Sequence, residues 1–155
     1  MLPIFPDGQT FVTGRAKYLY IPAIPSLDKS PRIRVPVKLG EFQISAVLDT
    51  GAPYIVCPPE IAEQMGLTPA DALDEVKMKV HDNTFVGYLH RLNVTLIAES
   101  GVNLELDTTV YVPQDWGNRP AYIGLVACLD SIIFAIEPRQ EQEFFYFGQT
   151  TSDYY

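Results

Sequence analysis

The sequence feature that most constrains the fold is an alternation of apolar and polar residues between positions 32 and 48. Apolar residues occupy every second position from 33 to 37, and the pattern returns from 42 to 48 after a turn at Gly40. A repeat of two residues is that of a β-strand with one buried face. Two such segments joined by a short turn that contains glycine predict a β-hairpin.

Asp49 follows directly on the second strand of this hairpin. Three apolar residues lead into it, and Thr50, Gly51 and Ala52 follow. Because an unpaired buried charge is costly, a carboxylate beside an apolar run needs a structural or chemical reason. Gly51 permits a turn geometry that a side chain would obstruct. The stretch therefore predicts a carboxylate held rigidly at the end of a strand, facing a cleft. A structural turn aspartate is the alternative interpretation.

Most of the remaining chain consists of short strand-like segments separated by turns. Thirteen prolines, ten glycines and nine tyrosines favour β-structure with many turns over a helical bundle. Helical signals lie in residues 58–66, which start with two prolines and end at Gly66, and in a short second start at Thr68, and a helical turn is expected between Leu125 and Asp130. The sequence thus predicts an all-β protein with one or two short helices. Further strands are expected over residues 16–22, 54–57, 76–80, 85–88, 92–96, 102–112, 121–124, 132–136 and 143–148.

The length of 155 residues fits one domain with room for a hydrophobic core. Prolines and glycines in residues 1–15 predict an N-terminal arm. Residues 16–148 form the predicted domain, and residues 149–155 form a short C-terminal tail.

Composition and charge argue against several classes of partner. A net charge of −8 with eleven scattered basic residues argues against nucleic acid, whose phosphates require clustered Lys and Arg. Apolar stretches stay well below the roughly 18 residues of a membrane span, and the N-terminus lacks the pattern of a signal peptide. Cys57 and Cys128 fit a reducing compartment as buried small residues, although their spacing leaves a disulfide open. We therefore expect a cytoplasmic protein without a metal or other cofactor.

The order of these features resembles the retropepsin-like aspartic proteases, single-lobed and of the bacterial type. A hairpin runs into Asp49-Thr50-Gly51-Ala52, then come a short strand, a helix and a second hairpin with a polar tip. After a loop, Ile123-Gly124 precedes a turn and a closing hairpin. The resemblance covers roughly residues 16–148. It implies a closed acid-protease barrel with a ψ-loop active site.

The resemblance also implies roles for individual residues of the turn and of its partner segment. Asp49 is the expected catalytic carboxylate, and Thr50 is expected to hydrogen-bond across a two-fold axis. Gly51 and Ala52 complete the turn. The ψ-loop partner is the segment that contains Ile123 and Gly124.

The second hairpin, residues 76–88, corresponds in this family to the flap that closes over a substrate. Its expected tip consists of His81, Asp82, Asn83 and Thr84. For His81, ordinary polarity of an exposed loop is the simpler interpretation.

Aspartic proteolysis needs two carboxylates that share one proton, one acting as a base on water and the other as an acid. This chain has a single Asp-Thr-Gly, because Asp107-Thr108 and Asp130-Ser131 are not followed by glycine. A two-fold dimer brings equivalent residues face to face, so the second carboxylate is expected from a second copy. The predicted function is that of a homodimeric aspartic endopeptidase, a hydrolase acting on peptides or unfolded protein.

Two departures from the family pattern motivate an alternative function. Retroviral-type members usually carry Arg-Asp after the late glycine, whereas Leu125 and Val126 follow Gly124 here. The expected flap tip also contains no glycine. The alternative is a catalytically weak or inactive retropepsin-like module that serves protein binding or dimerisation.

Overall fold

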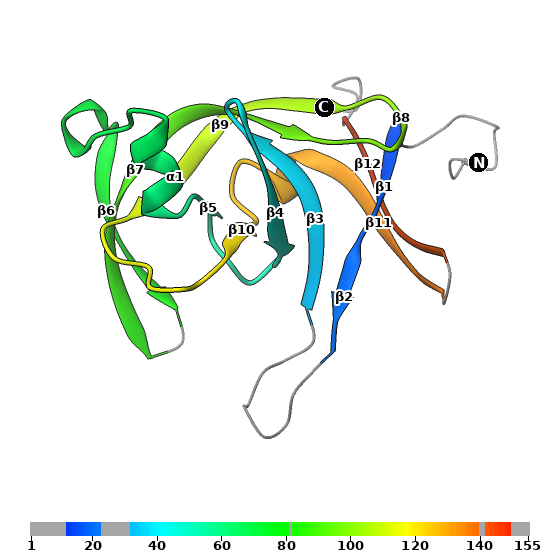
Figure 1. Ribbon diagram of the computed structural model, residues 1–155, viewed down its shortest axis with the longest axis horizontal. Coiled ribbons are helices and arrows are strands. Elements are labelled where there is room, and N and C mark those ends of the chain that lie inside the picture. Colours follow the sequence, from blue (N-terminus) through cyan, green and yellow to red (C-terminus); the bar gives the residue numbers. More distant parts are fainter. Residues whose placement is uncertain (1–11, 23–31, 81, 140–141, 150–155) are drawn as a thin grey trace.

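The computed structural model describes residues 12–22, 32–80, 82–139 and 142–149. These residues form two β-sheets and one short α-helix, which confirms the all-β class (Figure 1). Most of the predicted arm and tail, residues 1–11 and 150–155, lies outside the described residues. Within the part of the chain that is described, no helix is both long and apolar enough to cross a membrane.

The larger sheet has eight strands and contains the Asp49 turn. The hydrogen-bonded order is β2-β3-β4-β10-β5-β9-β7-β6, and an additional pairing joins β3 to β7. That pairing connects β3, β4, β10, β5, β9 and β7 into a ring of six strands. The strand bounds are β2 (Leu19–Ile21), β3 (Arg32–Leu39), β4 (Phe42–Leu48), β5 (Ile55–Val56), β6 (Asp74–Val80), β7 (Asn83–Leu96), β9 (Leu104–Pro113) and β10 (Ala121–Ile123).

The hairpin predicted from the alternation is formed by β3 and β4. The two strands pair antiparallel, with Val35 opposite Ala46. Gly40 adopts a φ of 57° at the turn, a left-handed conformation that favours glycine. Val35, Val37 and Leu39 are all buried, so the apolar half of the alternation faces the core.

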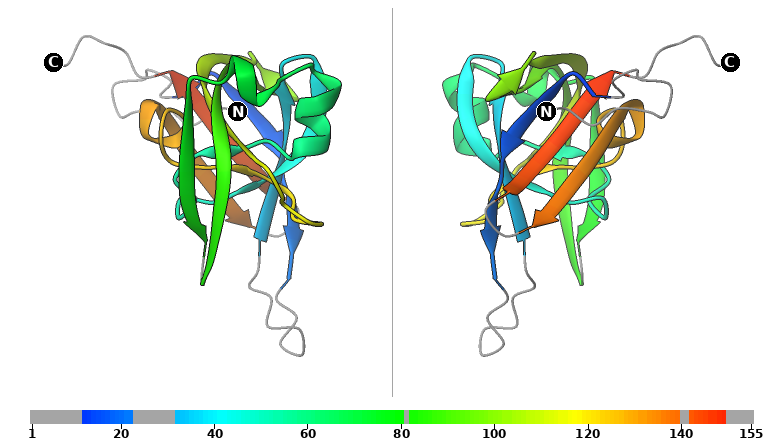
Figure 2. Two further views of the ribbon diagram at one scale, coloured as in Figure 1. Left: turned by 90° about the vertical axis from the view of Figure 1, so that its left-hand side faces the viewer. Right: turned by 90° about the vertical axis from the view of Figure 1, so that its right-hand side faces the viewer.

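The smaller sheet pairs a strand from the start of the described chain, β1, with one from its end, β12. Its order is β11-β12-β1-β8, and the right-hand view of Figure 2 shows β1, β12 and β11 side by side. The strand bounds are β1 (Gly14–Lys17), β8 (Ser100–Gly101), β11 (Ile132–Arg139) and β12 (Gln142–Gln149).

Two parts of the strand prediction differ from the structure. The expected strand 16–22 is divided, because β1 pairs with β12 in the smaller sheet whereas β2 pairs with β3 in the larger one. The segments expected at 85–88 and 92–96 belong to one 14-residue strand, β7. This strand pairs antiparallel with both β6 and β9. The helices are α1 (Pro59–Gln64) and the 3-10 turns η2 (Pro69–Asp71) and η3 (Leu129–Ser131).

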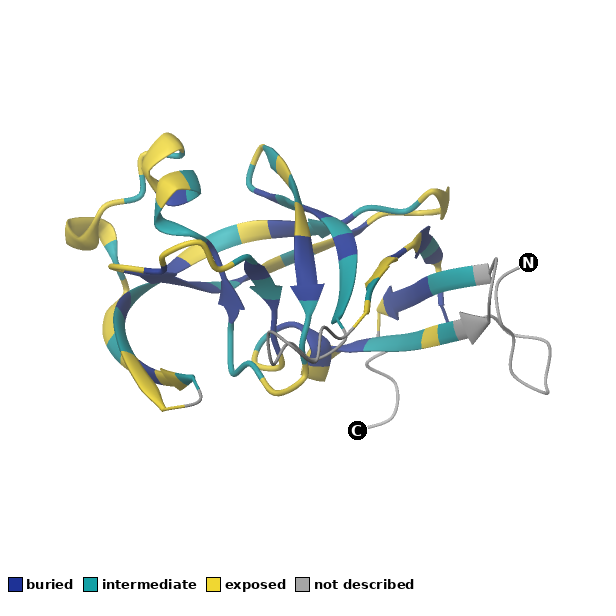
Figure 3. Cartoon of the chain, turned by 60° about the horizontal axis from the view of Figure 1, so that its bottom comes forward, coloured by how far each residue is buried: buried dark blue, intermediate teal, exposed yellow. Residues whose placement is uncertain are grey.

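The core lies inside the ring of strands and continues between the two sheets. In Figure 3, buried positions alternate with half-buried and exposed ones along most strands. A second buried cluster lies beneath the β6–β7 hairpin and consists of Val56, Met78, Tyr111 and Trp116. Burying this apolar surface is the main favourable contribution to folding, at about 25 cal/mol per Å².

Cys57 and Cys128 are buried free thiols, as the sequence predicted. Burial disfavours the thiolate and raises the pKa of each thiol to about 12. We therefore expect neither to react with a thiol reagent at about pH 8 until the protein unfolds. Titration with Ellman's reagent, with and without denaturant, checks this, and rapid modification of the native protein would contradict it.

Candidate active site

The Asp49 turn lies where three strands meet. β10 pairs parallel with β4, which places Ile123 beside Leu48. On its other side, β10 pairs antiparallel with β5 through Tyr122 and Val56. β4 and β5, which flank the turn in sequence, are therefore separated in space by β10, a strand from much later in the chain. This arrangement brings Ile123 and Gly124 against the turn.

Backbone hydrogen bonds fix the Asp49 turn. The Asp49 N–H donates to the Ile123 carbonyl at 3.0 Å, and the Ala52 N–H donates to the Asp49 carbonyl at 3.1 Å. The Gly51 N–H donates to Asp49 Oδ1 at 2.8 Å. Asp49 is half-buried, while Thr50 and Gly51 are exposed. The carboxylate is thus oriented by the backbone and remains accessible from outside.

Gly124 is required by the close approach of two backbone segments. A Cβ at this position would overlap the carbonyl oxygens of Tyr54 and Ala52. Beyond Gly124, the Leu125 N–H donates to Ala52 O and the Val126 N–H donates to Pro53 O, each at 2.8 Å. The chain after β10 is therefore bound directly to the Asp49 turn.

The turn forms one wall of a cleft of about 540 Å³. Asp49, Gly51 and Ala52 contribute to its lining, and Asp49 is the one carboxylate among the described residues that line it. The other lining residues come mainly from β3, β4, β5, β6 and β10 and from the loop before β10: Arg32, Ile33, Val47, Leu48, Pro53, Val56, Met78, Lys79, Val80, Trp116 and Tyr122.

The candidate flap is the hairpin of β6 and β7, paired from Asp74–Leu89 to Val80–Asn83. Asp82, Asn83 and Thr84 are exposed at its tip, and His81 lies outside the described residues. The cleft is lined by Met78, Lys79 and Val80, the three residues that directly precede the expected tip. The resemblance placed this hairpin over the substrate but assigned a role only to its tip, so these three residues were not predicted as site residues.

An aromatic cluster connects the candidate flap to β10. The buried Trp116 packs edge-on against Phe85 of β7 and Tyr122 of β10, with ring centroids 4.9 and 5.9 Å apart. Its indole N–H donates to Pro120 O at 2.8 Å. The Arg119 guanidinium lies 4.9 Å from the Phe85 centroid. Trp116 lies in the loop between β9 and β10 and was not among the predicted site residues.

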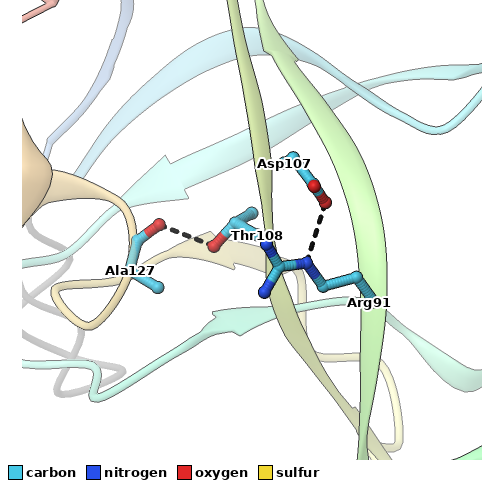
Figure 4. A network of polar contacts seen from close by, with 4 residues as sticks. All are labelled: Arg91, Asp107, Thr108 and Ala127. Atoms are coloured by element: carbon cyan, nitrogen blue, oxygen red, sulfur yellow. Dashed lines mark hydrogen bonds and ion pairs between the residues drawn. The ribbon is translucent and has the colours of Figure 1, made fainter.

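Asp107 and Asp130 do not belong to the cleft lining. Asp107 accepts a 2.8 Å hydrogen bond from Arg91 Nε, and this contact lowers the pKa of Asp107 (Figure 4). The adjacent Thr108 donates to the Ala127 carbonyl at 2.6 Å and so ties β9 to the segment that follows Gly124. Asp107 and Asp130 therefore do not supply a second carboxylate to this cleft.

Across the described ranges, no group of three or more His, Cys, Asp or Glu residues is arranged to hold a metal ion.

Comparison with solved structures identifies the class of fold. The chain resembles the crystal structure of a retropepsin-like aspartic protease from Rickettsia conorii, with a TM-score of 0.53 and 14% identity over 84% of this chain and 98% of that one. The fold is therefore retropepsin-like. The retroviral protease-like domain of Ddi1 from Leishmania major is more distant, with a TM-score of 0.45 and 15% identity over 80% of this chain and 98% of that one. No protein-family model matches the chain, and no curated protein sequence matches it significantly.

Proposed function

We propose that this protein is a homodimeric aspartic endopeptidase in which the Asp49 carboxylates of two subunits form one catalytic site. The observation that carries the proposal is the half-buried Asp49 carboxylate on the wall of the cleft, with Oδ1 held by the Gly51 N–H. An orienting donor and partial burial in a cleft suit an acid–base group. A turn aspartate with only a structural role does not require a cleft beside it.

The reaction divides between the two carboxylates. One of them, ionised, takes a proton from a water molecule as that water attacks the peptide carbonyl carbon. The other, protonated, gives its proton to the carbonyl oxygen, which yields a tetrahedral diol and leaves one proton on the pair. Return of protons and departure of the amine then complete hydrolysis. Gly51 and Ala52 form the floor on which the scissile bond lies.

The second carboxylate is proposed to come from a second copy across a two-fold axis. The surface beside the turn suits such a contact, because Leu125 and Val126 are 41% and 43% exposed although both are apolar. Their backbone is bound to residues 52 and 53 of the turn. Apolar packing of these residues would take the place of the Arg-Asp pair that retroviral-type members usually carry after the late glycine.

Introducing a charge at this surface tests the dimer. We expect Leu125→Glu combined with Val126→Glu to shift the protein to monomer, because each protomer would bury two unpaired carboxylates against their symmetry mates. Sedimentation equilibrium measures the shift, and specific activity per chain should fall in parallel. The matched control is Val102→Glu, an apolar residue that is 66% exposed at the β8–β9 connection. A double variant that stays dimeric would contradict this interface.

Cleavage of an unfolded protein by the purified wild-type chain tests the proposed function itself. We expect a bell-shaped dependence on pH, because the pair is active only when it holds a single proton. Activity per chain should also fall on dilution as dimers dissociate. An absence of cleavage between roughly pH 3 and pH 8, at concentrations where the protein is dimeric, would contradict the proposal.

A catalytically inactive module for binding or dimerisation is the second candidate. The observation that favours it is the exposed tip of Asp82, Asn83 and Thr84, which offers no glycine for flap movement. This function predicts a stable dimer, or a monomer, that binds peptides without cutting them.

A further inference from the structure

We propose that the cleft selects substrates carrying a carboxylate close to the scissile bond, and that Arg32 is the residue that binds it. The inference rests on the proposed function and names the substrate class. Arg32 begins β3 and lines the same cleft as Asp49. It is half-buried there, so its charge is partly removed from solvent and directed to whatever fills the cleft.

The Arg32 guanidinium is held by a rigid partner. Its Nη1 donates to the Tyr122 hydroxyl at 3.1 Å, and its central carbon lies 6.0 Å from the centroid of the Tyr122 ring. Tyr122 is itself fixed by strand pairing on both sides of β10 and by edge-on packing against Trp116. Binding of a ligand therefore does not need to order a long flexible side chain, a cost that usually weakens surface ion pairs.

Among the described residues, Tyr122 is the hydrogen-bond partner found for Arg32, which leaves donors of the guanidinium for a ligand. A guanidinium has five N–H donors, and Tyr122 accepts from one nitrogen. Among the described side chains, the ion pair found joins Arg91 to Asp107, and neither residue lines the cleft. No described carboxylate forms an ion pair with Arg32. Planar guanidinium groups bind carboxylates through two parallel hydrogen bonds, which gives both affinity and direction.

The charge of the cleft differs in sign from that of the chain. The protein carries a net charge of −8, yet the described lining contains Arg32 and Lys79 against the single carboxylate of Asp49. When two Asp49 carboxylates share a proton, each subunit contributes even less negative charge. A cationic lining in an acidic protein attracts anionic ligands and disfavours basic peptides.

Paired peptides measure the selectivity. A peptide library is digested with the wild-type protein, and the best cut site supplies a peptide that is then made with Glu or Gln at each nearby position. We expect the wild type to prefer one Glu peptide by about tenfold in kcat/KM. Arg32→Gln should bring this ratio close to one, mainly by lowering kcat/KM for the Glu peptide, since the guanidinium is the group proposed to bind the carboxylate. Arg32→Lys should restore part of it, because lysine keeps the charge but not the planar pair of donors.

Two further variants keep the test specific. Arg91→Gln removes a cation outside the cleft and should leave the Glu preference unchanged. Tyr122→Phe removes the acceptor that holds Arg32 and should reduce the preference partway. Peptides with amidated C-termini distinguish a side-chain carboxylate from the terminal one as the group that Arg32 binds. Thermal melts establish that each variant is folded.

Binding of the same peptides to the Asp49→Asn variant, measured by fluorescence anisotropy, provides a second readout that does not depend on turnover. If the wild type cuts no peptide but binds the Glu peptide selectively, and Arg32→Gln abolishes that selectivity, the result would support this inference while contradicting the endopeptidase function. Equal cleavage or binding of Glu and Gln peptides by the wild type would overturn the inference. So would a preference that survives Arg32→Gln, or a failure to bind either peptide.

Discussion

Replacing Asp49 by asparagine is expected to abolish peptide cleavage and to leave the fold intact. In a homodimer one substitution removes both carboxylates, so neither the base nor the acid remains, and the rate should fall by about ten-thousand-fold. The asparagine side chain has the same shape, and its oxygen can still accept the Gly51 N–H that now bonds to Asp49 Oδ1 at 2.8 Å. Initial rates on a quenched fluorescent peptide measure the loss, and a melting curve establishes that the turn is preserved.

Asp107→Asn is the matched control for this experiment. Asp107 also precedes a threonine, but it is exposed, pairs with Arg91 and does not line the cleft. Its replacement should leave cleavage unchanged, since an exposed ion pair contributes little to stability. Mixing experiments address the shared site: excess Asp49→Asn chain should inhibit the wild type, because mixed dimers hold one carboxylate. Undiminished cleavage by purified Asp49→Asn would exclude Asp49 as the catalytic acid or base.

Replacing Gly124 by alanine is expected to lower the stability of the fold more than replacing a glycine that has free space around it. The added Cβ would overlap the carbonyl oxygens of Tyr54 and Ala52, and both are backbone atoms that cannot rotate away. Relief requires β10 to move from the Asp49 turn, which weakens the Asp49–Ile123 and Leu125–Ala52 hydrogen bonds. We expect the free energy of unfolding to fall by about 3 kcal/mol, at the upper end of the usual cost of overpacking.

Urea denaturation of Gly124→Ala and Gly66→Ala separates steric overlap from backbone strain. Gly66 has a φ of 74°, where alanine is disfavoured, but a Cβ there meets nothing within 4 Å. Gly66→Ala should therefore cost only about 1 kcal/mol. If the two variants lose similar stability, the close approach at Gly124 is not the dominant constraint. Cleavage by any folded Gly124→Ala protein should also fall, because Asp49 loses its support.

Sequence reasoning succeeded where structure is local. The hairpin of β3 and β4 follows from an alternation that any strand with one buried face requires, and α1 follows from prolines at its start and glycine at its end. It failed at residues 16–22, because an alternating segment carries no information about which of two sheets its halves will join. The long strand β7 was divided in the prediction for the same reason: its continuity comes from neighbours distant in sequence.

The sequence by itself determined that an acid follows an apolar strand on a turn that contains glycine, and that this chain has one such Asp-Thr-Gly turn. The resemblance gave Ile123 and Gly124 as the expected partner segment of this turn, but only the tertiary structure decided which contacts surround the acid. Insertion of β10 between β4 and β5 brings Gly124 against the turn, and β6 borders the cleft. The contact of Arg32 with Tyr122 joins residues 90 positions apart. Such contacts depend on how strands pair across the ring, and local periodicity specifies which face of a strand is buried but not which strand lies beside it.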